Sequence, residues 1–172
     1  LKPYPVCTLL DIVSETVKQR PDQTALMFKG RRMNYAELDK LCSVFGAALA
    51  GLGVKKGERV ALLQPNSPQA IIAQLGAWKA GAIVCPINSL YTESELEHAL
   101  NECGAETVVT LTPFYQKVKK VQGQTAVKRV IASGIKDYLS PVMRLLFSLL
   151  KEKKEGHWMV IQASDYWMMY LM

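Results

Sequence analysis

The chain alternates between short apolar runs and longer segments in which apolar residues recur every three or four positions. Runs of the first kind predict β-strands, and the helical spacing of the second kind predicts amphipathic helices. From residue 59 onward the two kinds follow one another with a nearly even pitch. Strands are predicted at 59–64, 82–87, 106–111 and 127–132, and helices at 67–80, 92–103 and 113–122.

The predicted strands carry continuous apolar letters, such as VALL, AIVC and TVV, rather than an alternation of apolar and polar residues. Strands of this kind are typical of a parallel sheet that is covered on both faces. Because crossovers between parallel strands are right-handed, the pattern predicts a doubly wound α/β fold, with helices flanking a mostly parallel sheet.

A small β-hairpin is predicted before this repeating part. Residues 24–29 and 32–35 have the pattern of two short strands about a turn at Gly30-Arg31. A helix that begins at Thr8 and stops before Pro21 precedes the hairpin, and a helix ended by Gly53 follows it.

Three of the predicted helices begin with a capping box, in which a Thr or Asn side chain and an acidic side chain three residues later bond each other's backbone N–H groups. The pairs are Thr8 with Asp11, Asn34 with Glu37, and Thr92 with Glu95. The helix starts therefore support the order of elements that the apolar pattern predicts.

Length and composition are those of a globular domain, or of an incomplete part of a larger one, with 172 residues, 49% hydrophobic and 21% charged. The net charge of +6 is concentrated in part in the lysine-rich stretches 117–120 and 151–154. We expect these to be solvated faces rather than a nucleic-acid site, because no aromatic residues are interleaved for base stacking. Two other partners of the lysine-rich stretches stay open, the phosphate group of a small molecule and anionic lipid.

Cysteine and histidine usage predicts no metal site. His98 and His157 lie in polar surroundings, without the spacing of a zinc site. The cysteines have no Cys-x-x-Cys spacing, and we expect buried free thiols in a reducing compartment. They are Cys7, Cys42, Cys85 and Cys103.

Neither a signal peptide nor an apolar run of bilayer length is found, so we expect a cytoplasmic protein. The apolar segment 143–150, which precedes a lysine-rich stretch, leaves peripheral membrane contact open. The chain starts at Leu1 and both ends look cut. The apolar segment 160–172 predicts that the chain self-associates, for example as a homodimer, or binds hydrophobic surfaces.

One loop is placed where α/β proteins bind ligands. Asn88, Ser89, Leu90 and Tyr91 leave the carboxyl end of the predicted strand 82–87 and lead into a helix N-terminus. Ligands of open α/β sheets bind at this edge, where helix N-termini and loop amides converge. A plain connection is the alternative, and composition alone favours it.

Other glycine-containing stretches do not fit a nucleotide site. Residues 51–57 end a helix and precede a strand, which is the reverse of the order in a dinucleotide fingerprint. Residues 133–136 follow a strand but lack the glycine spacing of a phosphate loop. No Ser/His/Asp, Cys/His or paired-carboxylate arrangement stands out, so we assign no catalytic residue.

Two long stretches carry a family resemblance, GLGVKKGERVALLQPNSP and WKAGAIVCPINSLYTESELEHAL. They resemble the N-terminal part of AMP-forming acyl-CoA synthetases, and among these the long-chain fatty-acid CoA ligases most. The resemblance covers about residues 5–155, and we interpret residues 1–172 as the N-terminal portion of the large AMP-binding domain. The family's phosphate loop, magnesium ligand and mobile C-terminal domain are not found in these residues.

The resemblance implies a reaction that joins a fatty acid to coenzyme A at the expense of ATP, with Mg²⁺ as cofactor, by way of an acyl-adenylate. It also implies that loop 88–91, together with Gln116, Lys117, Lys119 and Lys120, approaches the nucleotide of coenzyme A. A solvated lysine face is the alternative. Because the phosphate-contacting motifs are absent, we expect the 172-residue chain alone to be inactive and to bind no cofactor tightly.

Two further functional hypotheses remain open at this stage. The first is a stand-alone, non-catalytic α/β binding or interaction module that keeps the fold without the chemistry. The second is activation of a carboxylic acid other than a fatty acid. Nucleic acid is not expected as a partner under either hypothesis.

Overall fold

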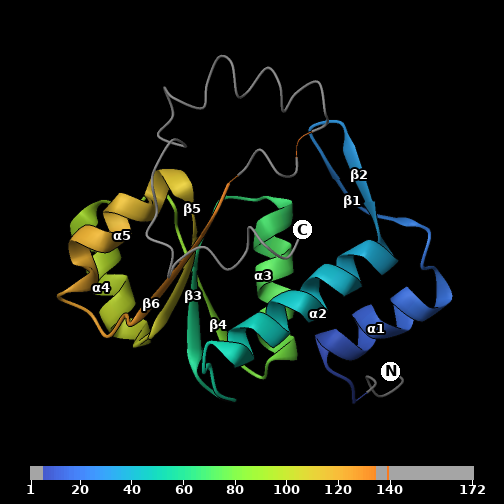
Figure 1. Cartoon of the computed structure of the whole chain (residues 1–172), viewed down its shortest axis with the longest axis horizontal. Coiled ribbons are helices and arrows are strands. Elements are labelled where there is room, and N and C mark those ends of the chain that lie inside the picture. The colour runs from blue at the N-terminus through green and yellow to red at the C-terminus, as the bar shows by residue number, and fades with distance from the viewer. Residues whose placement is uncertain (1–5, 135–138, 140–172) are drawn as a thin grey trace, which may run out of the picture.

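A four-stranded parallel sheet lies at the centre of residues 6–134 and 139, the part of the chain that the computed structural model describes (Figure 1). Its strand order is β4-β3-β5-β6, and all three pairings are parallel. The strands are β3 (Arg59–Leu63), β4 (Ile83–Ile87), β5 (Thr107–Leu111) and β6 (Arg129–Ser133). The predicted strands are thereby confirmed to within two residues at each end.

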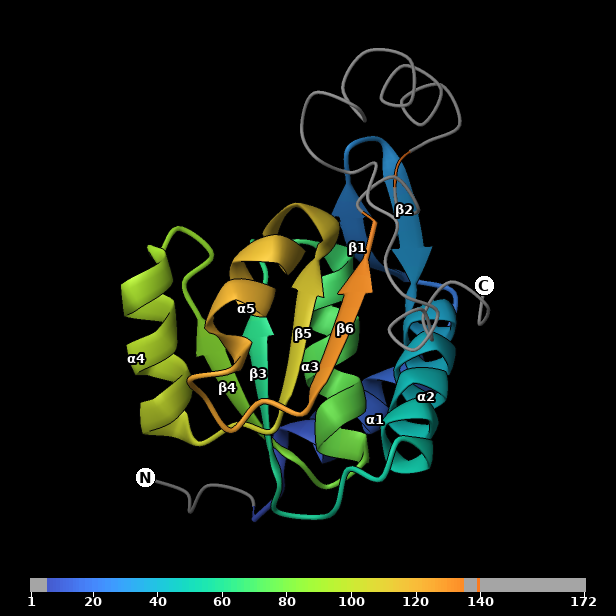
Figure 2. The ribbon, with the colours of Figure 1, turned by 60° about the vertical axis from the view of Figure 1, so that its left-hand side comes forward.

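Helices connect the strands and cover both faces of the sheet, as Figures 1 and 2 show. One face carries α2 (Tyr35–Gly51) and α3 (Pro68–Lys79), and the other carries α4 (Glu93–Cys103) and α5 (Tyr115–Gln122). The short 3-10 helix η1 (Thr112–Phe114) leads from β5 into α5. The predicted doubly wound α/β fold is confirmed.

Two hydrophobic cores share the central strand β3. Val60 and Leu62 point into the core that α2 and α3 cover, whereas Ala61 and Leu63 point into the core under α4 and α5. All four side chains are buried. This alternation explains the continuous apolar letters, because both faces of a central parallel strand lie under helices.

The edge strand β4 is less buried than the central strand β3. The prediction of buried thiols is therefore wrong for three of the four cysteines. Ile83 is 51% exposed, and Cys85 is only half-buried, because β4 has a neighbouring strand on one side only. Cys103, at the last position of α4, is also half-buried, and Cys7 is exposed. Cys42 alone among the four is buried, and all four are free.

The antiparallel hairpin lies beside this αβα unit, between α1 (Leu9–Gln19) and α2 in sequence. It consists of β1 (Thr24–Phe28) and β2 (Arg31–Asn34). Its turn is at Lys29-Gly30, not at the predicted Gly30-Arg31. Lys29 and Gly30 both have positive φ, 44° and 84°. A two-residue hairpin turn with positive φ at both positions matches the twist of its strands. Arg31 is the first residue of β2 and pairs with Phe28.

The three predicted capping boxes are confirmed at the starts of α1, α2 and α4. In the third box, Oγ1 of Thr92 accepts from the backbone N–H of Glu95 at 3.3 Å, and the Glu95 carboxylate accepts from the backbone N–H of Thr92 at 2.8 Å. These bonds satisfy N–H groups that have no partner within the helix.

Helices α2 and α3 pack with their backbones in close approach at two glycines. A Cβ at Gly76 would lie 2.8 Å from the carbonyl oxygen of Cys42 and 2.8 Å from Cδ1 of Phe45. A Cβ at Gly46 would lie 2.8 Å from the carbonyl oxygen of Gly76. No other residue fits at these two positions without movement of a helix.

Some sequence predictions concern residues outside the described part of the chain, namely the apolar segment 143–150, the apolar segment 160–172 and the polar surroundings of His157. Within residues 6–134, no helix combines the length and the apolar character needed to cross a membrane.

Candidate functional site

The carboxyl ends of β3, β4 and β5 lie at one edge of the sheet, where α3, α4 and η1 begin (Figure 2). Connections from β3 and β5 leave in opposite directions, because β3 leads to β4 on one side and β5 leads to β6 on the other. The position between β3 and β5, where the connections change direction, is the topological switch point of the sheet. A switch point and the adjacent helix N-termini are the usual position of a ligand in an open α/β sheet. Two candidate sites lie along this edge.

The first candidate site consists of loop 88–91 and the lysines of α5. Nζ of Lys117 donates to the carbonyl oxygen of Tyr91 at 2.6 Å and to that of Ser89 at 3.4 Å. Lys117 is half-buried, and its ammonium also lies 5.6 Å from the ring centre of Phe114. The structure therefore brings together two segments that lie 26 residues apart in the sequence.

The loop is held in shape by its own hydrogen bonds. Oδ1 of Asn88 accepts from the backbone N–H of Leu90 at 3.0 Å, and the carbonyl oxygen of Asn88 accepts from the N–H of Tyr91 at 3.2 Å. An Asn side chain that bonds the backbone two residues later is a common turn device. Leu90 is 85% exposed at the tip of the loop, so the first candidate site combines an apolar side chain of the loop with the ammonium group of Lys117 on α5.

The other predicted residues of α5 are placed differently. Lys120 forms an ion pair with Glu93 at 2.6 Å, and Nζ of Lys119 lies 5.9 Å from the ring centre of Tyr115. Both lysines are exposed, and so is Gln116. Because an exposed ion pair contributes little to stability, Lys120 can exchange Glu93 for another anion at small cost.

The positive charge of Lys117 acts on Glu95 in the first turn of α4. The pKa of Glu95 is lowered, first by its hydrogen bond from the backbone of Thr92, then by the Thr92 hydroxyl, and also by the charge of Lys117. The first candidate site thus combines a helix N-terminus with a cluster of ammonium groups, an arrangement suited to a phosphate group.

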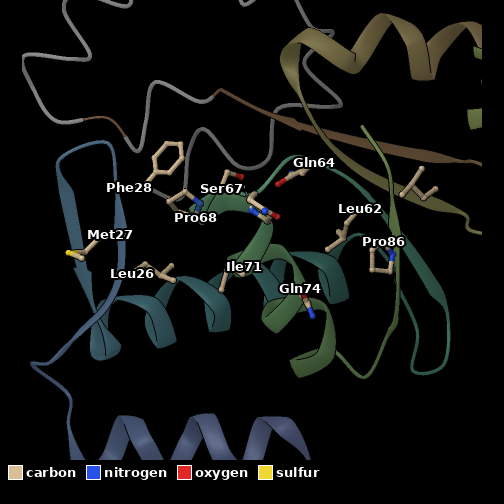
Figure 3. A pocket seen from close by; sticks show the side chains of 13 residues that line it. Leu26, Met27, Phe28, Leu62, Gln64, Ser67, Pro68, Ile71, Gln74 and Pro86 are labelled. Carbon is tan, nitrogen blue, oxygen red and sulfur yellow. Dashed lines mark hydrogen bonds between the residues drawn. The ribbon is translucent and has the colours of Figure 1, made fainter. Parts of the chain in front are cut away.

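The second candidate site is a groove of about 420 Å³ between the hairpin, the start of α3 and β4 (Figure 3). Its walls are apolar, with Leu26 and Phe28 on the hairpin side and Pro86 on the opposite side. Its polar lining includes Gln64, which follows β3, and Ser67, which caps α3. The groove therefore has the mixed lining of many small-molecule sites.

Several buried polar atoms at this edge have no hydrogen-bond partner among residues 6–134 and 139. They are both side-chain atoms of the Gln64 amide, Oε1 of Gln69 and Oγ of Ser133. Gln69 is 1% exposed, and its Nε2 donates to the carbonyl oxygen of Gly134 at 3.0 Å. These amide and hydroxyl groups can pair with the polar groups of a ligand at this edge.

The second site has no local signal in the sequence. The letters QPNSPQ after an apolar strand have the composition of an ordinary polar loop, and nothing local in them indicates that two glutamine amides are buried. The signal that was available is their position, since they follow the central strand at the carboxyl edge.

Metal ligands are not grouped in the part of the chain that the structure describes, where no three His, Cys, Asp or Glu side chains are placed to hold an ion. His98 is exposed on α4, with Nε2 at 4.0 Å from the Glu102 carboxylate. We therefore assign no metal ligand among the described residues.

Comparison with known proteins gives a family match over most of the chain. The model of the family described as AMP-binding enzyme matches residues 13–157. A long-chain-fatty-acid–CoA ligase of Escherichia coli is 41% identical over 134 residues, which is 77% of this chain and 24% of that protein. The corresponding ligase of Bacillus subtilis is 33% identical over 152 residues, 88% of this chain and 27% of that protein.

Solved structures of CoA ligases share the fold. An anthranilate CoA ligase in complex with anthranoyl-AMP has a TM-score of 0.71 at 28% identity, over 83% of this chain and 28% of that one. A long-chain-fatty-acid-CoA ligase from Archaeoglobus fulgidus has a TM-score of 0.70 at 26% identity, over 79% of this chain and 30% of that one. The chain spans about a quarter of the length of the curated relatives that it matches.

Proposed function

The chain belongs to the AMP-binding enzyme family, and we propose that it is the N-terminal part of a long-chain-fatty-acid CoA ligase. In the proposed reaction, a fatty-acid carboxylate oxygen bonds to the α-phosphorus of ATP, and pyrophosphate leaves. The thiol sulfur of coenzyme A then bonds to the acyl carbon of the adenylate, and AMP leaves. Identities of 33–41% to long-chain-fatty-acid–CoA ligases support a fatty acid as the substrate.

We assign to this chain a scaffold role and a share of the coenzyme A site. The observation that carries this assignment is the contact of Lys117 with loop 88–91 at the carboxyl edge of the sheet. We propose that the ammonium group of Lys117, which backbone carbonyls hold there, binds the 3′-phosphate of coenzyme A, and that Lys119 and Lys120, within one helical turn of it, add positive charge. A hydrogen bond between charged groups contributes about 1.5–3 kcal/mol, or about tenfold or more in affinity.

The substrate class is tested by pyrophosphate release from the intact enzyme that contains this chain. We expect release with long-chain fatty acids and little with anthranilate, benzoate or amino acids. Anthranilate is the sharpest competitor, since an anthranilate CoA ligase shares the fold. Release with an aryl or amino acid alone would contradict a fatty acid as the substrate.

The coenzyme site is tested by comparing coenzyme A with dephospho-coenzyme A, which lacks the 3′-phosphate. In the intact enzyme, Lys117→Ala is expected to raise the KM for coenzyme A at least tenfold and to leave the KM for dephospho-coenzyme A nearly unchanged. Lys119→Ala and Lys120→Ala in the same assay show how much each of these lysines contributes to binding of the 3′-phosphate. Equal effects on both substrates would leave Lys117 with a structural role only.

The 172-residue chain alone is proposed to be inactive and to bind Mg-ATP weakly, since the family's phosphate-contacting motifs do not occur in it. Calorimetric titration with Mg-ATP measures this directly. Micromolar affinity corresponds to about −8 kcal/mol and would require a nucleotide site within these residues.

A further inference from the structure

The tip of the β1-β2 hairpin carries cations without any acidic residue. Residues 24–34 contain Lys29, Arg31 and Arg32 but no Asp or Glu. All three side chains are exposed, and the turn of the hairpin points away from α1 and α2 in both views (Figures 1 and 2). The tip therefore presents positive charge where another surface can reach it.

One face of the hairpin combines this charge with an exposed apolar side chain. Met27 pairs with Arg32 across the two strands, so both side chains lie on the same face. Met27 is 71% exposed, whereas Leu26 and Phe28 belong to the opposite face, are half-buried and line the second candidate site. The outer face is therefore amphipathic, and the inner face is occupied by contacts within the protein.

The turn fixes the position of the cations. Lys29 is the first of the two turn residues with positive φ, and its Nζ lies 5.7 Å from the ring centre of Phe28. The ion pairs found among residues 6–134 include neither Lys29 nor Arg32. Within the described residues, no acidic side chain therefore neutralises these two charges.

The lysines of α5 differ from the hairpin tip, because acidic residues of α4 lie next to them. Lys120 forms an ion pair with Glu93, and the charge of Lys117 acts on Glu95. Opposite charges that lie within a Debye length of each other largely cancel toward a broad anionic surface. Of these two basic regions, the hairpin tip is thus the one suited to such a surface.

We propose that the hairpin tip docks on the anionic surface of a lipid bilayer, with Lys29 and Arg32 among the headgroup phosphates and Met27 inserted between the headgroups. Each such cation raises the partition coefficient on an anionic surface about fivefold, so the pair contributes about 25-fold. An exposed apolar side chain adds the burial of its surface at the headgroup boundary.

Docking would bring the chain to the phase in which long-chain fatty acids dissolve. This consequence for the substrate rests on the proposed function, but bilayer binding itself does not, since it is measured on the 172-residue chain without ATP, fatty acid or coenzyme A. Pyrophosphate release from the intact enzyme tests the proposed function separately, so the two can fail independently.

Cosedimentation of the 172-residue chain with vesicles tests the docking. Dithiothreitol is present because the Cys7 thiol is exposed. Phosphatidylcholine vesicles that contain about 30% phosphatidylglycerol are compared with pure phosphatidylcholine, and we expect a partition coefficient about tenfold higher or more on the anionic vesicles. The difference should shrink as NaCl is raised to about 0.5 M, which screens the charges. Equal binding to both kinds of vesicle, or binding to neither, would overturn the proposal.

A matched pair of double variants separates the hairpin from the net charge. Lys29→Gln with Arg32→Gln is expected to lower the partition coefficient on anionic vesicles about 25-fold. Lys55→Gln with Lys56→Gln removes the same two charges from exposed positions before β3 and should change it less than about twofold. Circular dichroism confirms that both variants are folded. Equal losses in the two double variants would mean that net charge alone drives binding and would overturn the docking site.

Met27 and a second polyanion complete the test. Met27→Gln should weaken the binding that remains at high salt, because the apolar contribution is not screened. A double-stranded DNA oligonucleotide is offered to the same chain, and we expect it neither to bind tightly nor to displace the chain from anionic vesicles. Binding to this DNA through Lys29 and Arg32, without binding to vesicles, would replace the bilayer by nucleic acid as the partner.

Discussion

Nε of Arg129, the first residue of β6, donates to Oγ1 of Thr107, the first residue of β5, at 2.8 Å. The same guanidinium forms an ion pair with Glu58, just before β3, and donates to the carbonyl oxygen of Leu52 at 3.3 Å. The side chains of Arg129 and Glu58 are 22% and 16% exposed. One side chain therefore joins the amino ends of three adjacent strands, opposite the edge that carries the candidate sites.

Arg129→Ala is expected to destabilise the chain by about 3 kcal/mol, because it leaves the carboxylate of Glu58 largely buried without its cation. Urea unfolding followed by circular dichroism measures the loss. Lys128→Ala is the matched control, since Lys128 pairs with Glu106 while 66% exposed and should contribute less than about 1 kcal/mol. Equal losses for the two variants would contradict the role assigned to Arg129.

Gly76→Ala is expected to destabilise the chain by about 3 kcal/mol, because its Cβ would clash with backbone and ring atoms of α2 that have no room to move. Thermal or urea unfolding is the measurement. Gly123→Ala serves as the control: no atom lies within 4 Å of its Cβ position, and its φ of −66° suits any residue. A change within about 0.5 kcal/mol is expected there, and a similar cost at both glycines would speak against close helix packing.

Lys117→Ala is expected to loosen loop 88–91 without unfolding the chain, because the loop carbonyls of Ser89 and Tyr91 lose their donor. Hydrogen exchange read out by mass spectrometry should show faster exchange in peptides that contain residues 88–92 and unchanged exchange in β3 and β5. Lys119→Ala, on the same helix but directed toward Tyr115, should leave the loop unchanged. Identical exchange in both variants would mean that Asn88 alone holds the loop.

Glu95→Gln is expected to reduce the loss of stability at acid pH. The hydrogen bond from the Thr92 backbone lowers the pKa of Glu95 below its ordinary 4.5, so its contribution is present above pH 4.5 and is lost as the pH falls through the lower, folded-state pKa. Urea unfolding at pH 7 and at pH 3 should therefore differ less for Glu95→Gln than for the unchanged chain. Glu97→Gln, outside the cap, should keep the original pH dependence.

Local signals account for most of what the sequence predicted about the fold. A capping box such as Asn34 with Glu37 fixes where a helix starts, and a continuous apolar run such as the one at Val60 identifies a buried strand. The order β4-β3-β5-β6 has no local signal, because it depends on which helix covers which face. For the same reason the exposure of Ile83 and Cys85 on the edge strand could not be read from an apolar pattern.

The first candidate site was partly predictable, because a loop that follows a parallel strand necessarily lies at the ligand edge. That Lys117, rather than Lys119 or Lys120, reaches the loop depends on the orientation of α5. The family resemblance predicted that loop 88–91 and α5 form the site, but only the packing of α5 determines that Lys117 contacts the loop. The burial of the Gln64 amide was not predictable, since burial of a polar side chain is a property of the assembled fold.

The sharing of β3 between two cores limits how the length of this protein can change during evolution. An insertion or deletion of one residue inside β3 would turn every following side chain to the opposite face, so Val60 and Leu62 would exchange cores with Ala61 and Leu63. Both cores would then be filled by side chains of the wrong volume. Homologous proteins are therefore expected to differ in length at surface turns such as 123–126, whereas β3 varies by substitution alone.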